Sequence, residues 1–287
     1  MNILLAGATG FVGTELVKEL AQETPAHSLR ILTRNPSGRV SGDPAAAKFV
    51  AWGDDLPEHL GWADAVVNLA GAGVADSRWT KERKEELHES RIGTTRRLVE
   101  ALRRTAKRPE VLVNASAVGY YGRGFLRDLC VEWEKSATEA RVSGLRVVRL
   151  RFGAVLDDGG GVMGKMLPPF RMFVGGPLGS GKQPFAWIHR ADAVAAIKFV
   201  VTNDLMEGPV NVTAPQSVTM NEFAKALGRV MGRPAVMRVP EWALKLLFGE
   251  MATIMTEGQD APPDELLAAG FKFRYSDLDS ALKEIVN

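Results

Sequence analysis

The sequence predicts a doubly wound α/β fold, in which helices cover both faces of a parallel sheet, followed by a smaller, mostly helical C-terminal lobe. Short, continuously apolar runs alternate with helical segments in the first half of the chain, as expected for parallel strands buried on both faces. After about residue 152, clusters of glycine and proline indicate loops between helices. We therefore divide the chain into residues 1–152 and residues 153–287.

Each element follows from the spacing of its apolar residues. Aliphatic and β-branched runs predict strands, in chain order at residues 2–6, 29–33, 49–52, 65–69, 111–115 and 146–151. A spacing of three to four residues predicts helices between them, at residues 11–21, about 80–105 and 125–143. In the C-terminal lobe the same spacing predicts helices at residues 220–231, 242–248 and 277–285, with few strands.

Composition excludes several classes of protein. The 287 residues are 46% hydrophobic and 24% charged, with a net charge of +2, so we expect neither disorder nor a nucleic-acid or anionic-membrane partner. One cysteine, Cys130, and four scattered histidines provide no disulfide framework and no metal-ligand cluster, and we expect no metal. Because no signal-like or membrane-spanning apolar run is present, we expect a cytoplasmic protein.

The strongest local signal is Gly7-Ala8-Thr9-Gly10-Phe11-Val12-Gly13, which follows the first predicted strand and opens the first helix. Such a loop lets backbone amides approach a pyrophosphate, and the helix N-terminus adds partial positive charge. The spacing is G-x-x-G-x-x-G rather than G-x-G-x-x-G, and a glycine-rich turn alone is often only a tight connection. Its position favours a Rossmann-type dinucleotide site at Gly7, Thr9, Gly10, Phe11, Val12 and Gly13.

The end of the second strand distinguishes the two nicotinamide dinucleotides. An NAD site usually places Asp or Glu about 20 residues after the glycines to bind the ribose hydroxyls, but here the sequence is Leu32-Thr33-Arg34-Asn35-Pro36. A carboxylate would repel a 2′-phosphate, whereas Arg34 can bind one bidentately. We therefore expect NADP(H), the alternative being that Arg34 is only a solvated loop arginine.

Further motifs resemble those of the extended short-chain dehydrogenase/reductase superfamily, namely Gly53–Leu56, Asn68–Gly71, Ser90–Thr94 and Ser116–Gly122. Within it, the chain is similar to the atypical "epimerase family", some of whose members are linked to cell division. This narrower resemblance rests on Asp76–Thr80, Gly164–Phe170, Gly175–Gly181, Trp187–His189, Gly232–Pro234, Gly249-Glu250 and Ala269–Phe271. It covers essentially the whole chain.

The resemblance implies further cofactor contacts. Thr33 and Arg34 should flank the adenosine 2′-phosphate of NADP(H). The remaining contacts that it implies are Leu69, Ala70, Glu86 and Arg91. For Glu86 and Arg91, the simpler interpretation is two charges on a helix surface.

The catalytic residues of the superfamily are only partly present. Its members normally use Ser, Tyr and Lys, where the tyrosine is the general acid/base and a lysine four residues later lowers the pKa of that tyrosine. The corresponding positions here are Leu126 and Cys130, and neither can take the role. Cys130 lies on the apolar side of its predicted helix, so we expect a buried packing residue rather than a nucleophile.

Several residues are candidates to replace the missing pair. Ser116 stands at a strand end where the superfamily serine binds a substrate oxygen, and Tyr121 is the candidate proton donor. Tyr120, Lys165 and His189 are candidates for the substrate side of the pocket. A solvated lysine and a histidine that caps local backbone are the simpler interpretations of the last two.

A second difference from the family is the length of the loop after Tyr120-Tyr121-Gly122. Relatives, as the resemblance implies, carry a longer acidic loop there, whereas only Arg123 and Gly124 separate Gly122 from the next predicted helix. Either this loop is short, or the sequence omits residues that would form a mobile lid over the nicotinamide.

Two functional hypotheses follow. The first is an NADP(H)-dependent oxidoreductase or epimerase-like enzyme, with the cofactor on residues 1–152 and a small polar substrate held against segments of residues 153–287. The second is a catalytically impaired regulatory protein whose NADPH occupancy sets the conformation that a partner meets. The missing Tyr/Lys pair favours the second, and the dinucleotide loop fits both. Pairing of the long helices into a homodimer stays open.

Overall fold

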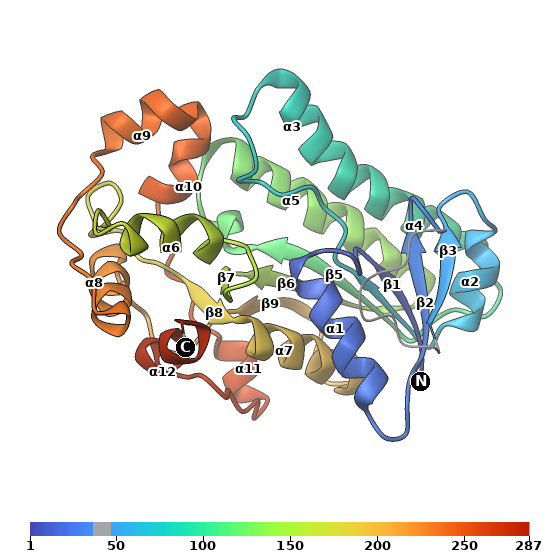
Figure 1. Ribbon diagram of the computed structural model, residues 1–287. Helices are drawn as coiled ribbons and strands as arrows, with labels where there is room; N and C mark the ends of the chain where they lie inside the picture. Colours follow the sequence, from blue (N-terminus) through green and yellow to red (C-terminus); the bar gives the residue numbers. More distant parts are fainter. Residues whose placement is uncertain (37–46, 287) are drawn as a thin grey trace.

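The structure, a computed structural model, describes residues 1–36 and 47–286. Its centre is a sheet with the strand order β3-β2-β1-β4-β5-β6-β9, in which every neighbouring pair is parallel (Figure 1). The strands are β1 (Asn2–Ala6), β2 (Ser28–Thr33), β3 (Ala47–Ala51), β4 (Ala65–Asn68), β5 (Val111–Ala117), β6 (Arg146–Phe152) and β9 (Gly208–Val212). This topology confirms the predicted doubly wound fold.

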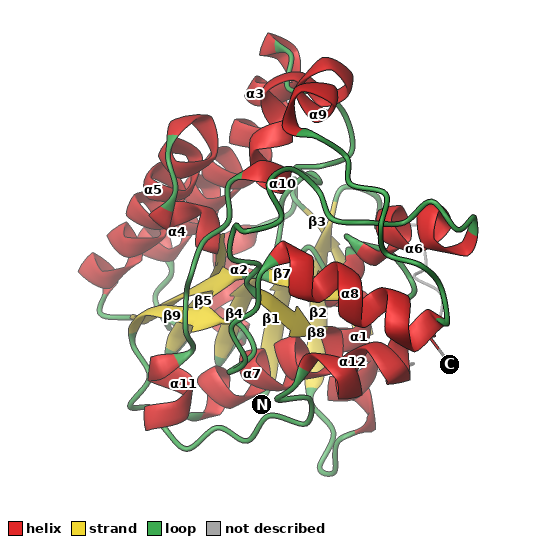
Figure 2. Cartoon of the chain, turned by 90° about the vertical axis from the view of Figure 1, so that its left-hand side faces the viewer, coloured by secondary structure: helices red, strands yellow, loops and turns green. Residues whose placement is uncertain are grey.

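Helices cover both faces of the sheet (Figure 2). One layer holds α1 (Phe11–Gln22), α7 (Arg190–Thr202) and α11 (Asp264–Ala268), and the other holds α2 (Leu56–Trp62), α4 (Thr94–Arg104) and α5 (Gly124–Thr138). Successive side chains of a strand point to opposite faces. Thus Ile3 and Leu5 of β1 enter the core with α1 and α7, whereas Leu4 enters the core with α2, α4 and α5.

The second part of the chain forms a smaller lobe around a core that contains Phe170, Trp187 and Phe223, all buried. Its elements are β7 (Ala154–Leu156) paired with β8 (Trp187–His189), α6 (Met163–Arg171), α8 (Met220–Met231) and α12 (Leu278–Val286). An arm made of α9 (Glu241–Phe248) and α10 (Thr253–Thr256) reaches toward α3 (Lys81–His88) (Figure 1). An ion pair of 2.5 Å between Lys84 and Glu250 joins that arm to α3.

The largest difference from the sequence-based expectation lies in residues 190–212. Periodicity predicts neither α7 nor β9, yet α7 covers the main sheet and β9 is its last strand. Because α7 is buried on most of its surface, its helical periodicity is weak, and β9 begins with Gly208-Pro209. The long helix expected at residues 80–105 is α3 and α4, joined by a π-helical turn at Glu89–Gly93. The division at residue 152 stays a prediction.

Candidate functional site

The glycine-rich loop between β1 and α1 has the tight geometry of a dinucleotide cradle. Gly7 has a φ of +79°, and a Cβ there would lie 2.5 Å from the carbonyl carbon of Leu69. A Cβ at Gly13 would lie 2.3 Å from the Gly7 oxygen, so only glycine allows this approach of helix to strand. Gly10 caps α1 without a side-chain acceptor, which leaves first-turn amides available to an anion. This geometry is compatible with a pyrophosphate, and the contacts expected at Gly7, Thr9, Gly10, Phe11, Val12 and Gly13 stay predictions.

The carboxyl ends of β2 and β3 lie at the same edge of the sheet as the glycine-rich loop, where the adenosine of the cofactor is predicted to bind. Thr33 Oγ1 accepts a hydrogen bond of 3.2 Å from the backbone amide two residues on, and Arg34 is exposed. Among the described residues, Arg34 has no ion-pair partner. The two acids after β3, Asp54 and Asp55, accept backbone amide hydrogen bonds of 2.8 Å and 3.4 Å within their own loop. Both carboxylates are exposed, with one oxygen of each hydrogen-bonded, so the exposed Arg34 is the feature here that suits a 2′-phosphate.

The loop after β4 lies against the glycine-rich loop, with Leu69 and Ala70 half-buried. Arg91 supports this loop, because its Nη2 donates to the Ala72 carbonyl at 2.7 Å while only 8% of the residue is exposed. Burial lowers the pKa of Arg91 to about 10, so the guanidinium stays charged at neutral pH. It stands on the π-helical turn Glu89–Gly93, an irregularity often found at functional sites. In the part of the chain that the structure describes, Arg91 has no ion-pair partner and faces the Trp133 ring at 5.2 Å, so its positive charge favours an anion nearby.

Ser116, at the end of β5, belongs to a buried ionic group. Its Oγ donates to Glu134 Oε1 at 2.8 Å. Arg151 binds the same carboxylate through Nε at 2.7 Å and through Nη2 at 2.9 Å. Burial alone would lower the pKa of Arg151, but its hydrogen bonds to Glu134 and Tyr121 raise it well above the ordinary value. Arg151 is therefore charged inside the protein.

Tyr121 joins this group from the opposite side. Its hydroxyl accepts a hydrogen bond from Arg151 Nη1 at 2.8 Å and donates one to Asn211 Oδ1 at 2.9 Å. Strand register explains the meeting, because Ser116, Arg151 and Asn211 are direct neighbours across β5, β6 and β9. The Arg151 guanidinium also lies 3.6 Å from the ring centre of Tyr120. Tyr121 is 44% exposed as a residue, while its hydroxyl contacts two buried side chains, Arg151 and Asn211.

Of this ionic group, the sequence analysis names Ser116, Tyr120 and Tyr121 as candidates but not their buried partners. The residues it misses are Glu134, Arg151 and Asn211. For Arg151 a signal is available, since it stands with Arg146 and Arg149 in a strand predicted to be buried on both faces, where a charge is costly unless it is paired. For Asn211 none is available, because β9 itself is not predicted.

Two apolar packing residues occupy the places of the missing Tyr/Lys pair. A Cβ at Gly119 would lie 2.7 Å from the Leu126 side chain, so Leu126 fills the space against the loop after β5. Cys130 is 2% exposed, and burial raises the pKa of its thiol to about 11. This confirms the predicted packing role of Cys130.

Glu86 and Lys165 lie at the rim. Glu86 is exposed on α3 and forms an ion pair of 2.5 Å with Arg83. Lys165 Nζ donates to the Ala75 carbonyl and so connects α6 to the loop after β4. Neither contact tests the predicted roles of these residues, which stay predictions.

His189 lies elsewhere than its predicted position on the substrate side. It is 3% exposed, and its Nδ1 accepts the Ala191 amide at 3.1 Å, which caps α7. Its Nε2 contacts Glu284 of α12 at 2.7 Å, and its ring lies against Tyr275. Both ring nitrogens are thus used within the lobe, and the simpler interpretation as a backbone cap describes the observed contacts.

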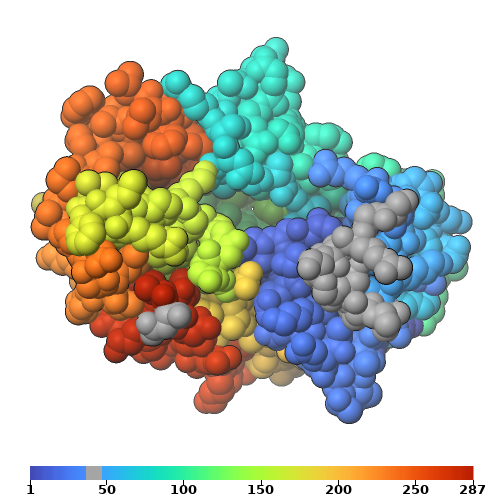
Figure 3. All heavy atoms as spheres, in the orientation of Figure 1, coloured from blue at the N-terminus to red at the C-terminus, as the bar shows by residue number. Residues whose placement is uncertain are grey.

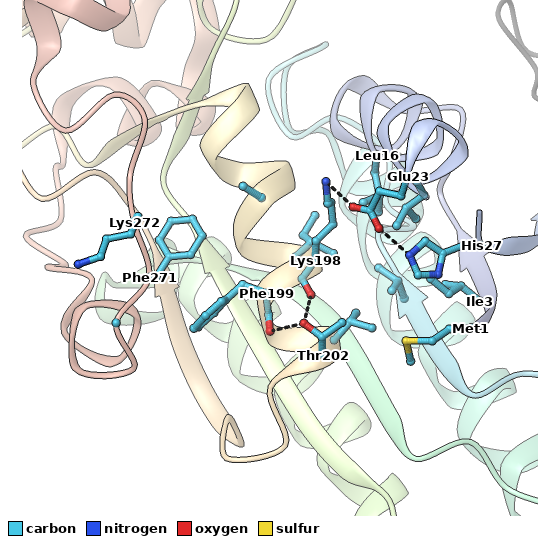
Figure 4. A pocket seen from close by; sticks show the side chains of 16 residues that line it. Met1, Ile3, Leu16, Glu23, His27, Lys198, Phe199, Thr202, Phe271 and Lys272 are labelled. Carbon is cyan, nitrogen blue, oxygen red and sulfur yellow. Dashed lines mark hydrogen bonds and ion pairs between the residues drawn. The ribbon is translucent and has the colours of Figure 1, made fainter. Parts of the chain in front are cut away.

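The elements of the site surround a hollow in the surface. Figure 3 shows it between the N-terminal segment in blue, the segment near residues 70–80 in cyan and the segment near residues 155–165 in yellow-green. A separate pocket of about 470 Å³ lies between α1, α7 and the residues around Phe271, at the opposite edge of the sheet (Figure 4). Its polar groups bind one another, with 2.7 Å between Lys198 and Glu23 and 2.6 Å between Glu23 and His27. It holds none of the predicted site residues.

Comparison with known proteins decides the family. Residues 3–132 match the NAD dependent epimerase/dehydratase family, and residues 239–285 match a domain of unknown function, DUF1731. The epimerase family protein SDR39U1 homolog, chloroplastic, of Arabidopsis thaliana is 39% identical over 305 residues, which cover 100% of this chain and 87% of that protein. The chain belongs to the epimerase family.

Other members agree with this assignment. An epimerase family protein of Staphylococcus epidermidis is 38% identical over 299 residues, covering 99% of this chain and 98% of that protein. The crystal structure of human epimerase family protein SDR39U1 with NADPH superimposes with a TM-score of 0.87 at 33% identity, covering 99% of each chain. The predicted family resemblance is therefore confirmed.

The DUF1731 segment of this epimerase family chain covers the Tyr121 side of the site. Met251 packs in one buried cluster with Trp79. Near Tyr121, Glu257 pairs with Arg123 at 3.1 Å. Within residues 1–36 and 47–286, no helix has the length and apolarity to cross a bilayer, and no group of three metal-ligating side chains occurs. The cytoplasmic location stays a prediction, since one relative is named as chloroplastic.

Proposed function

We propose that this epimerase family chain binds NADP(H) and acts as an oxidoreductase or epimerase-like enzyme on a small polar substrate. The tight cradle at residues 7–13 supports a dinucleotide. The exposed Arg34 after β2, where an NAD site usually has a carboxylate, supports the 2′-phosphate of NADP(H) rather than NAD. The NADPH bound to the human relative supports the same choice.

One observation carries the enzymatic role: Arg151 donates to the Tyr121 hydroxyl at 2.8 Å. In the superfamily a lysine four residues after the tyrosine, on the same helix, assists it, and here a cation from β6 faces a tyrosine hydroxyl instead. A cation that donates to a phenolic oxygen stabilises negative charge on that oxygen. The bidentate contact with Glu134 fixes the guanidinium in this orientation.

The chain's own residues then move one proton. NADPH, when bound, supplies a hydride to a substrate carbonyl carbon. When a substrate carbonyl oxygen replaces Asn211 Oδ1 as the acceptor of the Tyr121 hydroxyl, Tyr121 gives its proton to that oxygen. The phenolate left behind keeps the hydrogen bond from Arg151 Nη1. Because Tyr121 is 44% exposed, it regains a proton from solvent. Ser116 has committed its own proton to Glu134, so it can accept a hydrogen bond from a substrate hydroxyl but not donate one.

Turnover tests this proposal. NADPH oxidation is followed with a panel of small aldehydes, ketones and quinones, and Tyr121→Phe should lower kcat by on the order of 100-fold or more. Tyr120→Phe is the matched control, because it keeps the ring against which Arg151 lies, and it should stay near the unmodified rate. Equal losses in both variants, or no loss in Tyr121→Phe, would exclude Tyr121 as the proton donor.

The regulatory alternative also has an observation in its favour. Leu126 and Cys130 occupy the places of the usual pair, and the Ser116 proton is held by Glu134, so the superfamily's own catalytic set is not assembled. This hypothesis predicts tight NADPH binding with no turnover on the panel. It also predicts that hydrogen exchange on the protein surface changes when NADPH binds.

A further inference from the structure

The segment of residues 157–165, which we call the strap, leaves β7, passes beside the glycine-rich loop and ends in the first turn of α6. Its first anchor is ionic. Asp157 pairs with Arg190 at 2.8 Å, and the Arg190 guanidinium lies 5.0 Å from the centre of the Phe11 ring. Arg190 also approaches Glu15 of α1 at 3.6 Å. The strap is thus tied to the first turn of the helix whose N-terminus belongs to the proposed cofactor site.

The glycines of the strap fit the same ring. A Cβ at Gly160 would lie 3.3 Å from the Phe11 ring, and one at Gly161 would lie 3.1 Å from it. Gly161 also has a φ of +58°, which disfavours any other residue. This fits Gly160 and Gly161, where an added Cβ would push the Phe11 ring aside, whereas a Cβ at Gly159 would make only ordinary contacts.

The second anchor lies at the other end of the strap. Lys165 Nζ donates to the Ala75 carbonyl in the loop after β4. Phe11 and Ala75 belong to the two loops that border the hollow in Figure 3, and the strap lies along its third side. A chain segment fixed to both borders narrows the opening through which a ligand must pass.

We propose that residues 157–165 are a strap that controls exchange of the dinucleotide, and that its two anchors, on Phe11 and on Ala75, must part for the cofactor to enter or leave. This inference rests on the proposed NADP(H) site. A gate of this kind has a kinetic signature: loosening it speeds association and dissociation together and leaves the affinity nearly unchanged. A residue that merely contacts the cofactor changes dissociation and affinity together.

The test uses Lys165→Met, which keeps the side-chain stem but cannot donate to Ala75. Stopped-flow NADPH fluorescence should show association and dissociation rates both raised, on the order of fivefold, with Kd changed less than about twofold. Lys182→Met is the matched control, since Lys182 is an exposed lysine of the same lobe, and it should leave both rates unchanged. Asp157→Asn, which weakens the other anchor, should act in the same direction.

Hydrogen exchange of the protein without cofactor supplies an independent readout. Lys165→Met should speed exchange within residues 157–165, whereas Lys182→Met should not. Faster dissociation with an equally weakened Kd would make Lys165 a direct contact and overturn the strap, and unchanged rates together with unchanged exchange would also overturn it. If the unmodified protein binds no NADPH while exchange responds as expected, the proposed function fails and the gating claim falls with it.

Discussion

The two halves of the proposed site are built in different ways. The cofactor cradle is one continuous segment, residues 7–13, whose shape depends on glycines at fixed positions. The group around Tyr121 takes its partners from strands β6 and β9, 30 and 90 positions away. A backbone motif of the first kind can be found in a sequence. A side-chain network of the second kind depends on strand register, so the fold must be known first.

The largest expected effect is on the free energy of unfolding, when Arg151 is removed from the group around Tyr121. Arg151→Met leaves the Glu134 carboxylate, 2% exposed, without its bidentate partner. Removing one member of a buried ion pair costs about 3–5 kcal/mol of unfolding free energy, which urea denaturation measures. Adding Glu134→Gln to Arg151→Met should recover most of that loss. A single-variant loss below about 1 kcal/mol would show that the pair contributes no more than a surface salt bridge.

A single methyl group added at Gly13 should weaken both the stability of the protein and its binding of NADPH. Gly13→Ala places a Cβ 2.3 Å from the Gly7 oxygen, so helix and strand must separate. We expect a loss of about 1–3 kcal/mol in unfolding free energy together with weaker NADPH binding. Gly164→Ala is the control, because nothing lies within 4 Å of its Cβ, and it should be neutral or slightly stabilising. Similar behaviour of both variants would contradict the tight cradle.

The smallest effect is expected at Cys130, where the superfamily lysine is replaced. Burial raises the pKa of this thiol from 9.0 to about 11. Well below pH 9 the Cys130 thiol is protonated in both the folded and the unfolded protein. Above about pH 9 the thiol ionises in the unfolded chain but not in the folded one, so the free energy of unfolding falls as the pH rises toward 11. Between about pH 8 and pH 9.5 this loss is under ~1 kcal/mol. Denaturation of Cys130→Ala over the same range should lack that loss, and an identical pH dependence would place the thiol in a solvated position.

Some residues of the proposed site can be predicted from the sequence alone, and others cannot. Residues 7–13 and Arg34 can be predicted as cofactor contacts because local glycines and a strand end have direct chemical meaning, and their roles stay predictions. The loss of the usual pair at Leu126 and Cys130 is also found, from spacing along one helix. Arg151 and Asn211 are missed because they meet only through the β5-β6-β9 register, and β9 carries no clear strand pattern.

His189 illustrates the opposite error. Its position after a conspicuous motif suggests a substrate contact, yet the fold turns both ring nitrogens toward its own lobe, at 3.1 Å from the Ala191 amide and 2.7 Å from Glu284. A polar residue near a motif can serve the capping of the next helix, and only the direction of the side chain separates the two roles.

The most direct test of the central claim is a parallel fluorescence titration of the unmodified protein and of Arg34→Ala with NADPH and with NADH. We expect NADPH to bind at least about tenfold more tightly than NADH, equivalent to about 1.4 kcal/mol, and Arg34→Ala to abolish this preference without weakening NADH. Equal binding of the two cofactors by the unmodified protein would contradict the phosphate role of Arg34, and binding of neither would contradict the cofactor site itself.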